Sequence, residues 1–556
     1  MFRLSIRGET VDSFRVTEDS NGFTINSDEL FQNVTFHIVG LENVESCKIK
    51  ILFEDGSQTI DSKDIIYNTG VFDARNWIEV NESSSDPVSK ARIFIDSYEL
   101  STNPKIEHWL SKKNTNSVPY LSTPSPSRSA NPDNPPIIIV SVDSLRHDRL
   151  SRFKPLLNEM DGAVTPSEPR TQGTSTWPAH ASLFTGVHPL EHGCTNDAIA
   201  PQIDPSLTTL AELLEKHGYR NSAVVSSGNL SPQLGYGRGF HRYQVQDIDW
   251  KRRERDVRTV FRTFKDWMSA DIKSGATRGS YFLHIFDVHY PYIPPDHYAG
   301  STDFDFSQYD TYVELAKNRD YVDLLKHDPL NIDEITINQI TGLYDRCVDF
   351  VVDQLLDLIL YLKRVDVYDD SLIIIAGDHG EDFYERNFIY HHSLYNENIK
   401  PGMIVKPPAS GGFSVPDEVD YIDILPTIAS LLGSEKAVDQ SSGSPFTERT
   451  PEQPRITERL LDTYNVSIEL HGEKLIFTYT GNKEPSKLVE GGPSYIEQSS
   501  DDGYRAVESR DELTEAEYEL ETHVRSFVKD RSFSVDSSDK NISSEVEDRL
   551  EELGYK

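Results

Sequence analysis

Three apolar runs of the sequence each lead into an acidic residue. The carboxylates and the runs before them are Asp143 after 137–142, Asp287 after 281–286 and Asp378 after 372–376. Continuous runs rich in β-branched residues are typical of strands buried on both faces of a parallel sheet. Because ligands bind at the carboxyl edge of such sheets, we expect the three carboxylates to converge at one rim.

Histidines accompany two of these carboxylates. His289 lies two residues after Asp287, and His379 directly follows Asp378. An acidic residue after a single strand is more often a helix cap or a turn residue, but three such ends, two of them with histidine, are hard to explain as caps. Carboxylates with imidazole suit a divalent metal of the Zn, Mn or Mg kind.

A threonine hydroxyl that could act as a nucleophile precedes a short helical segment. Thr176 opens the sequence TWPAHASLFTG, in which residues 181–186 read as a short helix closed by Gly186. Thr176 should therefore lie at a helix N-terminus, where free amides and the helix dipole stabilise an anion. A metal beside this hydroxyl would lower its pKa and make it a nucleophile.

Alternating strands and helices predict an α/β sheet with helical crossovers for the larger part of the chain. The expected helices are 207–217, 252–268 and 338–362, and the expected strands include 221–225, 281–286 and 371–376. Residues 1–110 instead alternate apolar and polar side chains in short runs, which predicts a small β-sandwich. Residues 111–134 are rich in Ser, Pro and Asn and predict a linker, which places the α/β domain at 135–556 with a C-terminal subregion from about 440.

The composition of the chain limits its possible partners, its cysteine chemistry and its cellular location. The chain has 556 residues, with 55 Lys and Arg against 91 Asp and Glu, for a formal net charge of -36. This charge argues against a nucleic-acid surface and is the pattern expected of a halophilic protein. Three scattered cysteines do not suggest a disulfide framework or a thiolate metal site. The absence of a signal sequence and of a long apolar run predicts a cytoplasmic protein without a membrane span.

The ordered motifs from residue 137 onward resemble the sulfatase and alkaline-phosphatase superfamily. They are VDSLRHD at 142–148, TWPAHASLFTG at 176–186, Pro189 with His192-Gly193, FLHIFDVHYPYIPP at 282–295, AGDHGE at 376–381, Tyr395-Asn396-Glu397, VDYIDILPTIASLLG at 419–433 and the ending at 547–555. The resemblance implies an alkaline-phosphatase-like sheet with helices on both faces, preceded here by the small all-β domain.

The resemblance also implies roles for individual residues. Asp143, Asp378 and His379 would be metal ligands, with Thr176 both a ligand and the covalent nucleophile. His289 would hold a substrate oxygen or assist the leaving group. Further candidates for a second metal or for substrate contact are Asp287, His391, His392, His180 and Arg146. The cofactor would be a divalent ion, Mn, Zn, Mg or Ca, with one ion favoured because Asp287 and His289 are closer in sequence than in two-metal members.

The sequence departs from the sulfatases at the nucleophile. Those enzymes convert a cysteine or serine in a Cys/Ser-x-Pro-Ser-Arg context into formylglycine, which Thr176 cannot become. TWPAH at 176–180 is closer to the Thr-Phe-Pro-Asn-His of nucleotide pyrophosphatase/phosphodiesterases, and phosphoglycerol transferases also use a threonine. The resemblance therefore implies cleavage or transfer of a phosphate or sulfate ester through a covalent Thr176 intermediate, with small-molecule or glycan esters as substrates and surface-glycan biosynthesis as a setting.

Three alternatives stay open at this point. A transferase would pass the sulfo or phospho group to a glycan alcohol instead of water, and the sequence does not show the acceptor. A non-catalytic binding module would be expected to have lost ligands, whereas Asp143, Thr176, Asp378 and His379 are all present. A Ser-His-Asp hydrolase ranks last, because no Gly-x-Ser-x-Gly elbow follows a strand.

Overall fold

The structure is a computed structural model, and the parts of the chain that it describes form two compact units. It describes residues 134–195, 202–245, 257–273, 279–290, 292–299, 334–383, 385–386, 389–391, 393–434, 439–460, 463–479, 495–500, 503–507 and 510–529, and the strands between residues 4 and 126. One unit comprises residues 1–133 with the segments 214–223 and 239–245, and the other comprises the remaining residues. All candidate site residues that are described belong to the second unit.

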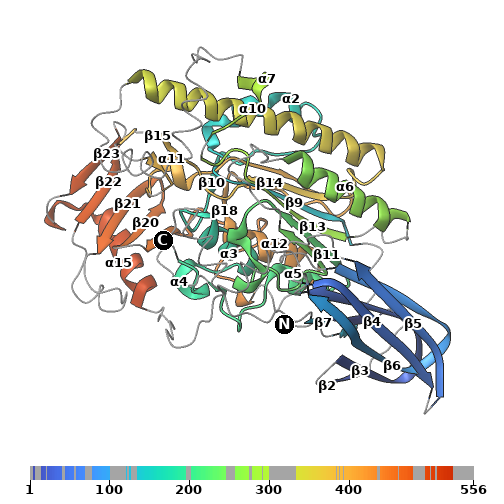
Figure 1. The fold of residues 1–556 in the computed structure, drawn as a ribbon. Coiled ribbons are helices and arrows are strands. Elements are labelled where there is room, and N and C mark those ends of the chain that lie inside the picture. Colours follow the sequence, from blue (N-terminus) through green and yellow to red (C-terminus); the bar gives the residue numbers. More distant parts are fainter. Residues whose placement is uncertain are drawn as a thin grey trace. The chain divides into compact units, whose positions relative to one another are not determined.

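The strands between residues 4 and 126 form one eight-stranded sheet (Figure 1). They are β1 (Leu4–Ile6), β2 (Phe14–Asp19), β3 (Gly22–Val39), β4 (Val44–Asp55), β5 (Gln58–Asn68), β6 (Ile78–Leu100), β7 (Tyr120–Leu121) and β8 (Pro124–Pro126). Their order is β5-β4-β6-β3-β1-β8, with β2 and β7 also pairing with β3. Strands β7 and β8 fall within the segment predicted as a linker. The sandwich and the boundaries at 110 and 134 stay predictions.

A second, six-stranded sheet organises the α/β part of the chain. Its strands, in spatial order, are β12 (Arg242–Val245), β11 (Arg220–Val225), β13 (Gly279–Ile285), β9 (Ile137–Val142), β14 (Leu372–Gly377) and β17 (Met403–Lys406). Strand β9 is parallel to both β13 and β14, whereas β17 is antiparallel to β14. The prediction of a mixed α/β fold around a mainly parallel sheet is confirmed, because all three apolar runs are neighbouring central strands.

The longer helices lie close to where the apolar periodicity predicts them. They are α3 (Thr176–Thr185), α5 (Leu210–Lys216), α6 (Val257–Lys273), α10 (Glu334–Arg364) and α12 (Ile424–Leu431). Shorter elements connect them: α2 (Lys154–Leu157), α4 (Pro189–His192), α7 (Asp296–Ala299), α11 (Asn396–Ile399), β10 (Glu168–Arg170), β15 (Asp382–Phe383), β16 (Ile389–Tyr390) and β18 (Glu418–Asp420). The bounds of α5, α6 and α10 differ from the predicted ones by a few residues, as helix ends usually do.

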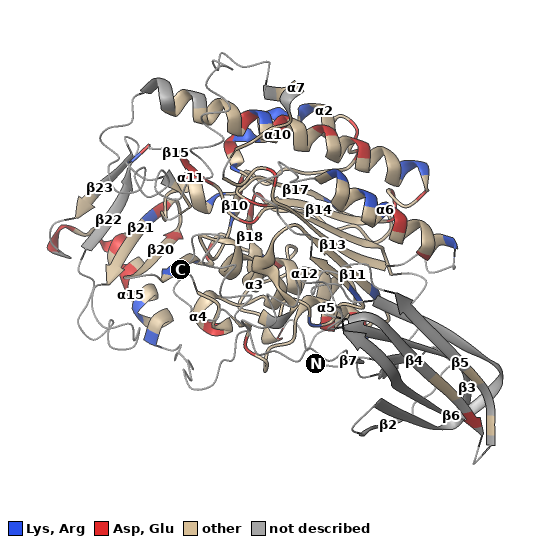
Figure 2. Cartoon of the chain, in the orientation of Figure 1, with Lys and Arg blue, Asp and Glu red and all other residues tan. Residues whose placement is uncertain are grey.

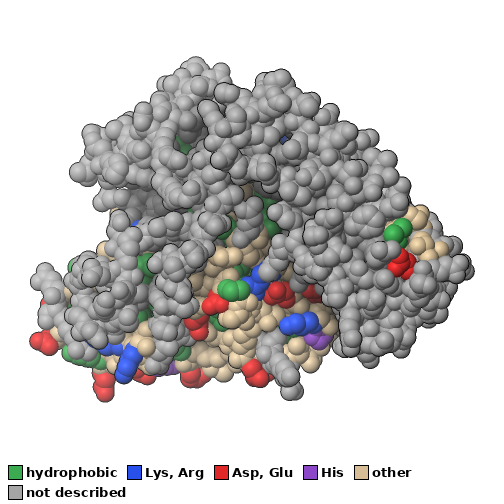
Figure 3. All heavy atoms as spheres, turned by 60° about the horizontal axis from the view of Figure 1, so that its bottom comes forward, with side chains coloured by type: hydrophobic (Ala, Val, Ile, Leu, Met, Phe, Trp, Pro, Cys, Tyr) green, Lys and Arg blue, Asp and Glu red, His purple; other side chains and the backbone are tan. Residues whose placement is uncertain are grey.

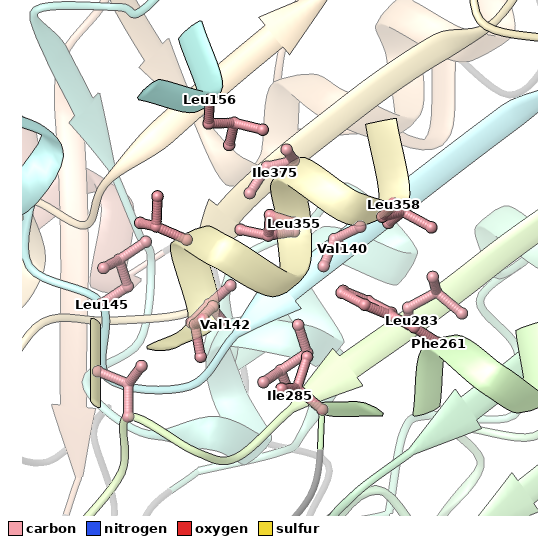
Figure 4. Packing of buried hydrophobic residues seen from close by; sticks show 14 of the residues in the cluster. Val140, Val142, Leu145, Leu156, Phe261, Leu283, Ile285, Leu355, Leu358 and Ile375 are labelled. Atoms are coloured by element: carbon pink, nitrogen blue, oxygen red, sulfur yellow. The ribbon is translucent and has the colours of Figure 1, made fainter. Parts of the chain in front are cut away.

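Alternate residues of the central strands face different helices. Val140 and Val142 of β9 pack with Leu283 of β13, Phe261 of α6 and Leu355 of α10 in one buried cluster (Figure 4). The residues between them point to the opposite face, because side chains alternate along a strand. That opposite face is covered by α3, so helices pack on both sides of the sheet and the residues that follow β9 and β14 emerge at its edge.

The C-terminal region forms a separate antiparallel sheet within the second unit. Its strands are β19 (Arg455–Leu460), β20 (Tyr464–Leu470), β21 (Glu473–Tyr479), β22 (Tyr495–Ser500) and β23 (Gly503–Val507), paired in sequence order. Helix α15 (Glu515–Lys529) packs its apolar face, including Leu520 and Val524, against this sheet. These elements lie in the subregion predicted from about residue 440.

Acidic and basic residues alternate along α6 and α10, and others lie on the C-terminal strands and α15 (Figure 2). Asp345 of α10, for example, is 2.8 Å from both Arg149 and Arg152. One face of the molecule likewise shows acidic side chains with basic ones between them (Figure 3). Among the helices that the structure describes, none has the length and apolar character needed to cross a membrane.

Candidate active site and metal centre

Asp143, Asp378 and His379 lie together at the carboxyl ends of β9 and β14. The register pairs Val142 with Gly377, so the two aspartates leave the sheet at the same level. All three side chains are buried, with at most 1% of any residue exposed. The structure therefore brings Asp143 together with the adjacent pair Asp378 and His379, which lie more than 200 residues further along the sequence, and all three were predicted as metal ligands.

The turn after Asp143 holds both carboxylates in place. Ser144 adopts a left-handed backbone with φ 62°, and its amide donates a hydrogen bond of 3.0 Å to Oδ1 of Asp378. Its hydroxyl donates to Oδ1 of Asp143 at 3.2 Å. The amide of His379 also donates to Oδ1 of Asp378, at 2.9 Å. One oxygen of Asp378 is thus fixed by backbone amides, which leaves the other oxygen for a ligand.

The remaining donor atoms fit a divalent cation. Nδ1 of His379 bonds to the carbonyl of Gly380 at 2.8 Å, so Nδ1 carries the proton and Nε2 presents its lone pair. Nε2 lies 3.5 Å from Oδ2 of Asp378 and 3.6 Å from Oδ1 of Asp143. Among the described residues, neither Oδ2 of Asp378 nor Nε2 of His379 has a hydrogen-bond partner. Bonds of ~2.1 Å in a tetrahedral zinc site would separate ligand atoms by about 3.4 Å, close to these spacings.

The pKa values of the two carboxyl groups shift in opposite directions because their neighbours differ. Burial would raise the pKa of Asp143, but the nearby His289, His284 and His379 together hold it below its usual range. Burial, followed by the charge of Asp143, raises the pKa of Asp378 well above its usual range. Two buried carboxylates this close repel each other when both are ionised, and a bound cation would remove that repulsion.

Thr176 is the first residue of α3 and contacts the carboxylate group directly. Its hydroxyl donates a hydrogen bond of 3.1 Å to Oδ2 of Asp143. The helix begins at Thr176, after Ser175 in an extended conformation, and ends before Gly186, whose φ of 72° caps it. It starts at the hydroxyl, as expected, and includes the whole apolar segment up to Thr185. The hydroxyl therefore lies at the positive end of a ten-residue helix.

His180 lies one turn further along α3, over the sheet. Its Nδ1 bonds to the carbonyl of Thr176 at 2.7 Å, and its Nε2 bonds to the hydroxyl of Ser141 at 2.8 Å. Nδ1 must carry a proton to bond with a carbonyl, and Nε2 then accepts from the serine. Burial lowers the pKa of His180 to about 3, so the ring is neutral at pH 7. This arrangement anchors the start of α3 to β9.

Asp287 and His289 make contacts with different partners. The carboxylate of Asp287 accepts from the amide of Val257 at 3.1 Å and 3.3 Å, and so caps the start of α6. His289 stacks on Phe286 with ring centroids 4.1 Å apart, and its ring lies 5.3 Å from that of His391. The part that Asp287 would take in a second metal site stays a prediction.

His391 extends the buried histidine group. Its ring lies 4.4 Å from that of His379, and its Nδ1 is 3.8 Å from a carboxylate oxygen of Glu381. Burial raises the pKa of Glu381 to about 8. His392, which the sequence also offered as a candidate, lies outside the described residues.

Arg146 interacts with acidic residues and a backbone carbonyl outside the group formed by Asp143, Asp378 and His379. Its guanidinium bonds to Asp148 at 2.9 Å and to Glu385 at 2.6 Å, donates to the carbonyl of Glu381 at 3.0 Å, and lies over the ring of Phe383. These partners engage the guanidinium from several sides. The structure thus gives Arg146 a role in holding the loop after β14, and its contact with substrate stays a prediction.

Comparison with known protein families shows which family this chain belongs to. The family model described as "Sulfatase" matches residues 135–434, which is more than half of the chain. The chain belongs to the sulfatase family. The matched region includes every candidate site residue discussed above, together with the six strands of the central sheet.

Individual sulfatase relatives are distant. Arylsulfatase K of Mus musculus is 22% identical over 300 residues, covering 46% of this chain and 52% of the relative. Arylsulfatase K of Homo sapiens is 23% identical over 304 residues, covering 46% and 54%. The chain therefore spans about half the length of these curated relatives.

Solved structures show the same fold. A phosphonate monoester hydrolase from Silicibacter pomeroyi is similar with a TM-score of 0.53 and 17% identity, over 72% of this chain and 95% of that one. A protein solved with its substrate D-glucosamine-2-N,6-O-disulfate is similar with a TM-score of 0.50 and 13% identity, over 73% of this chain and 100% of that one. At these identities the likeness establishes the fold alone.

Within this sulfatase-family site, the sequence interpretation overlooked His284. This residue lies inside the apolar run that forms β13, is fully buried, and places Nε2 3.4 Å from Oδ2 of Asp143. The available signal was an imidazole in the middle of an otherwise apolar buried strand. Ser144 was overlooked as well, because a left-handed serine has no clear sequence signature.

Proposed function

We propose that this sulfatase-family protein is a metal-dependent hydrolase of phosphate or sulfate esters that forms a covalent intermediate on Thr176. One observation carries the proposal: the Thr176 hydroxyl donates to Oδ2 of Asp143, within the same buried group as Asp378 and His379. A nucleophile, a set of cation ligands and a helix N-terminus thus meet at one point. This combination suits attack on a phosphoryl or sulfuryl centre.

Asp143, Asp378 and His379 would hold one divalent cation, with the Thr176 oxygen beside it. The geometric support is the buried group that these three side chains form, with ligand atoms within 4.8 Å of one another. When bound, Zn, Mn, Mg or Ca would supply positive charge that lowers the pKa of a neighbouring hydroxyl and neutralises ester oxygens.

The chain's own groups would then carry the reaction in two steps. Thr176 Oγ1, oriented by its hydrogen bond to Asp143, would form a bond to phosphorus or sulfur as the bond to the ester's alcohol oxygen breaks. The proton of the threonine hydroxyl would pass to the departing alcohol. Amides at the start of α3 would stabilise the equatorial oxygens, and His289 would hold an oxygen or assist the leaving group. Water would then cleave the threonine ester and restore the hydroxyl.

A threonine at this position separates the proposed mechanism from formylglycine chemistry. The side chain of Thr176 carries a secondary alcohol, whose oxidation would give a ketone and no aldehyde. The fourth residue after it is His180, which bonds to the Thr176 carbonyl and Ser141. The hydroxyl itself is therefore the attacking group in this proposal.

Sulfated and phosphorylated sugars are the proposed substrates. A structural neighbour holds a sulfated glucosamine as its substrate, so sulfated or phosphorylated sugars are the first esters to test. Transfer of the group to a glycan alcohol, in surface-glycan biosynthesis within the cytoplasm of a haloarchaeon, is the alternative outcome of the second step. In this proposal residues 1–110 form an accessory β-domain that takes no part in the chemistry.

The proposal is tested by supplying metals and esters separately. Purified protein loaded with Mn, Zn, Mg or Ca is assayed with aryl phosphate monoesters and diesters, phosphonates, sulfates and sulfated glucosamine. Turnover with a mass increase on Thr176 of a phosphoryl or sulfuryl group during a slow reaction supports the covalent hydrolase. Bound metal without turnover of any ester favours the transferase, whereas absence of metal binding argues for a non-catalytic binding module.

A further inference from the structure

The C-terminal sheet contacts the segment of chain that leads into the candidate nucleophile. Residues 168–173 run along β19, the first strand of that sheet, and Gly173 pairs with Glu458 in a parallel bridge. The amide of Glu458 donates a hydrogen bond of 2.9 Å to the carbonyl of Gln172. Because Thr176 follows only three residues after Gly173, β19 holds the chain directly before the nucleophile.

Two side chains of β19 add contacts to the same segment. The hydroxyl of Thr457 donates to the carbonyl of Thr171 at 2.6 Å, and the guanidinium of Arg455 donates to the carbonyl of Glu168 at 2.6 Å. Thr457 is fully buried. A buried carbonyl that loses its donor costs free energy, so this segment should stay in contact with β19.

The segment is packed closely against the first turn of α3. A Cβ atom at Gly173 would lie 2.5 Å from Cβ of Pro178 and 2.9 Å from the amide nitrogen of Ala179. That amide donates to the carbonyl of Ser175 at 3.2 Å. Because there is no space for even a methyl group between the segment and the helix, a shift of the segment would be passed on to the turn that begins with Thr176.

We propose that Thr457 is a positioning residue, through which the C-terminal sheet sets the location of the Thr176 hydroxyl. This inference rests on the proposed function, because it concerns the nucleophile of that site. Thr457 holds the Thr171 carbonyl, and the chain that follows brings the Thr176 hydroxyl to 3.1 Å from Oδ2 of Asp143. A reacting group must be held within about 0.5 Å of its productive position.

Attachment of the C-terminal sheet does not depend on this one hydroxyl. Leu190 of α4 lies in the same buried apolar cluster as Leu475 of β21. Arg455 is also paired with Asp420 of β18, at 3.0 Å. Loss of the Thr457 hydroxyl should therefore move the segment before α3 without releasing the sheet from the rest of its unit.

The test is Thr457→Val in the full chain, which keeps a side chain of similar shape and removes its donor. With the aryl phosphate or sulfate that wild type cleaves fastest, kcat should fall by about 10-fold or more, since a misplacement of about 1 Å can cost roughly 100-fold. KM and metal affinity should stay close to the wild-type values. Thr457→Ser restores a hydroxyl and should restore most of the rate.

Hydrogen exchange provides a second measurement that does not depend on turnover. Amides of residues 171–179 should exchange faster in Thr457→Val than in wild type, because the segment is held less firmly. Mass spectrometry of peptides from this region reports the change, and Thr457→Ser should exchange as wild type does.

Thr478→Val is the matched control. Thr478 lies on β21 of the same sheet, and its hydroxyl donates to Oδ1 of Asn465 on β20 at 2.8 Å. The variant loses a hydroxyl bond that joins two strands within the sheet. It should keep the wild-type kcat and the wild-type exchange of residues 171–179, and denaturant unfolding measures the stability that each variant loses.

The contrary results are distinct. An unchanged kcat in Thr457→Val, or an equal loss in Thr457→Val and Thr478→Val, would overturn the positioning role and leave the proposed function intact. A rate loss that Thr457→Ser does not reverse would also overturn it, because the hydroxyl would then not be the group responsible. Absence of ester turnover in wild type would overturn both this inference and the proposed function.

Discussion

The backbone amide of Ser144 donates a hydrogen bond of 3.0 Å to Oδ1 of Asp378 and thereby joins the ends of β9 and β14. The amide can point there because Ser144 has a φ of 62°, in the left-handed region. A side chain in that region costs about 1–2 kcal/mol relative to the right-handed conformation. The protein thus holds a strained residue at the point where its two carboxylates meet, as functional sites often do.

Replacing Ser144 with glycine should relieve this strain. Glycine adopts positive φ without a steric cost, so metal-free Ser144→Gly should have a free energy of unfolding up to about 1 kcal/mol higher than that of metal-free Ser144→Ala, since both lose the hydroxyl bond to Asp143. The amide bond to Asp378 should persist. Denaturant unfolding measures the change, and Ser144→Ala is the control because it loses the same hydroxyl but keeps the strain. Equal stabilities for the two variants would contradict the strain argument.

Thr176 separates a covalent mechanism from attack by water. Thr176→Ala should lose turnover by several orders of magnitude while binding metal only somewhat more weakly, because the nucleophile is removed but Asp143, Asp378 and His379 remain. Thr176→Ser should keep part of the activity. Steady-state kinetics and metal titration provide the two measurements. Undiminished turnover in Thr176→Ala would refute the covalent intermediate.

Thr176→Cys tests the relation to formylglycine chemistry. Coexpression of this variant with a formylglycine-generating enzyme should yield little sulfatase activity. His180 stands where the modification motif has arginine, and it is bonded to the Thr176 carbonyl and Ser141. Mass spectrometry reports whether the cysteine is oxidised to the aldehyde. Efficient conversion with high sulfatase activity would show that the local sequence does not limit the chemistry.

Asp378→Asn should abolish metal binding without unfolding the protein. The amide oxygen can still accept from Ser144 and His379, whereas the charge that burial and Asp143 make unfavourable is removed. The metal-free variant should therefore be at least as stable as wild type at pH 7. Asp378→Ala is the comparison, since it leaves two buried amides without an acceptor at about 1–3 kcal/mol each. Aggregation of the Asn variant would mean that the charge itself is structural.

Asp382 should make the stability of the metal-free protein depend on pH. Burial, aided by the charge of Glu381, raises the pKa of Asp382 from 3.8 to about 8. The folded state therefore retains a proton that the unfolded state releases, and wild type should lose stability as pH rises from about 4 to about 8. The loss attributable to one such group is at most about 1.4 kcal/mol per pH unit.

Asp382→Asn isolates this contribution. The variant should gain stability relative to wild type across the same interval and show a constant difference above pH 8. Unfolding by denaturant at a series of pH values gives the difference. A difference that does not change with pH would show that Asp382 is already ionised in the folded protein.

The sequence by itself determined the local features of this protein. The apolar runs before Asp143 and Asp378 specified buried strands, and the pattern from Thr176 to Gly186 specified a short helix with a hydroxyl at its start. These features are local. Strand and helix periodicity, and a glycine that can adopt positive φ, are properties of residues that lie close together in the sequence. The family motifs then predicted which of these residues share a site.

Only the tertiary structure decided how the remaining residues are used. Asp287 follows an apolar strand just as Asp143 does, but packing of α6 turns it into a helix cap. Arg146 is held by Glu385 from the loop after β14. His284 reaches Asp143 because β13 pairs with β9 in a register that sets it opposite Ser141. Such roles arise from contacts between distant segments, whose register and side-chain partners no local pattern specifies.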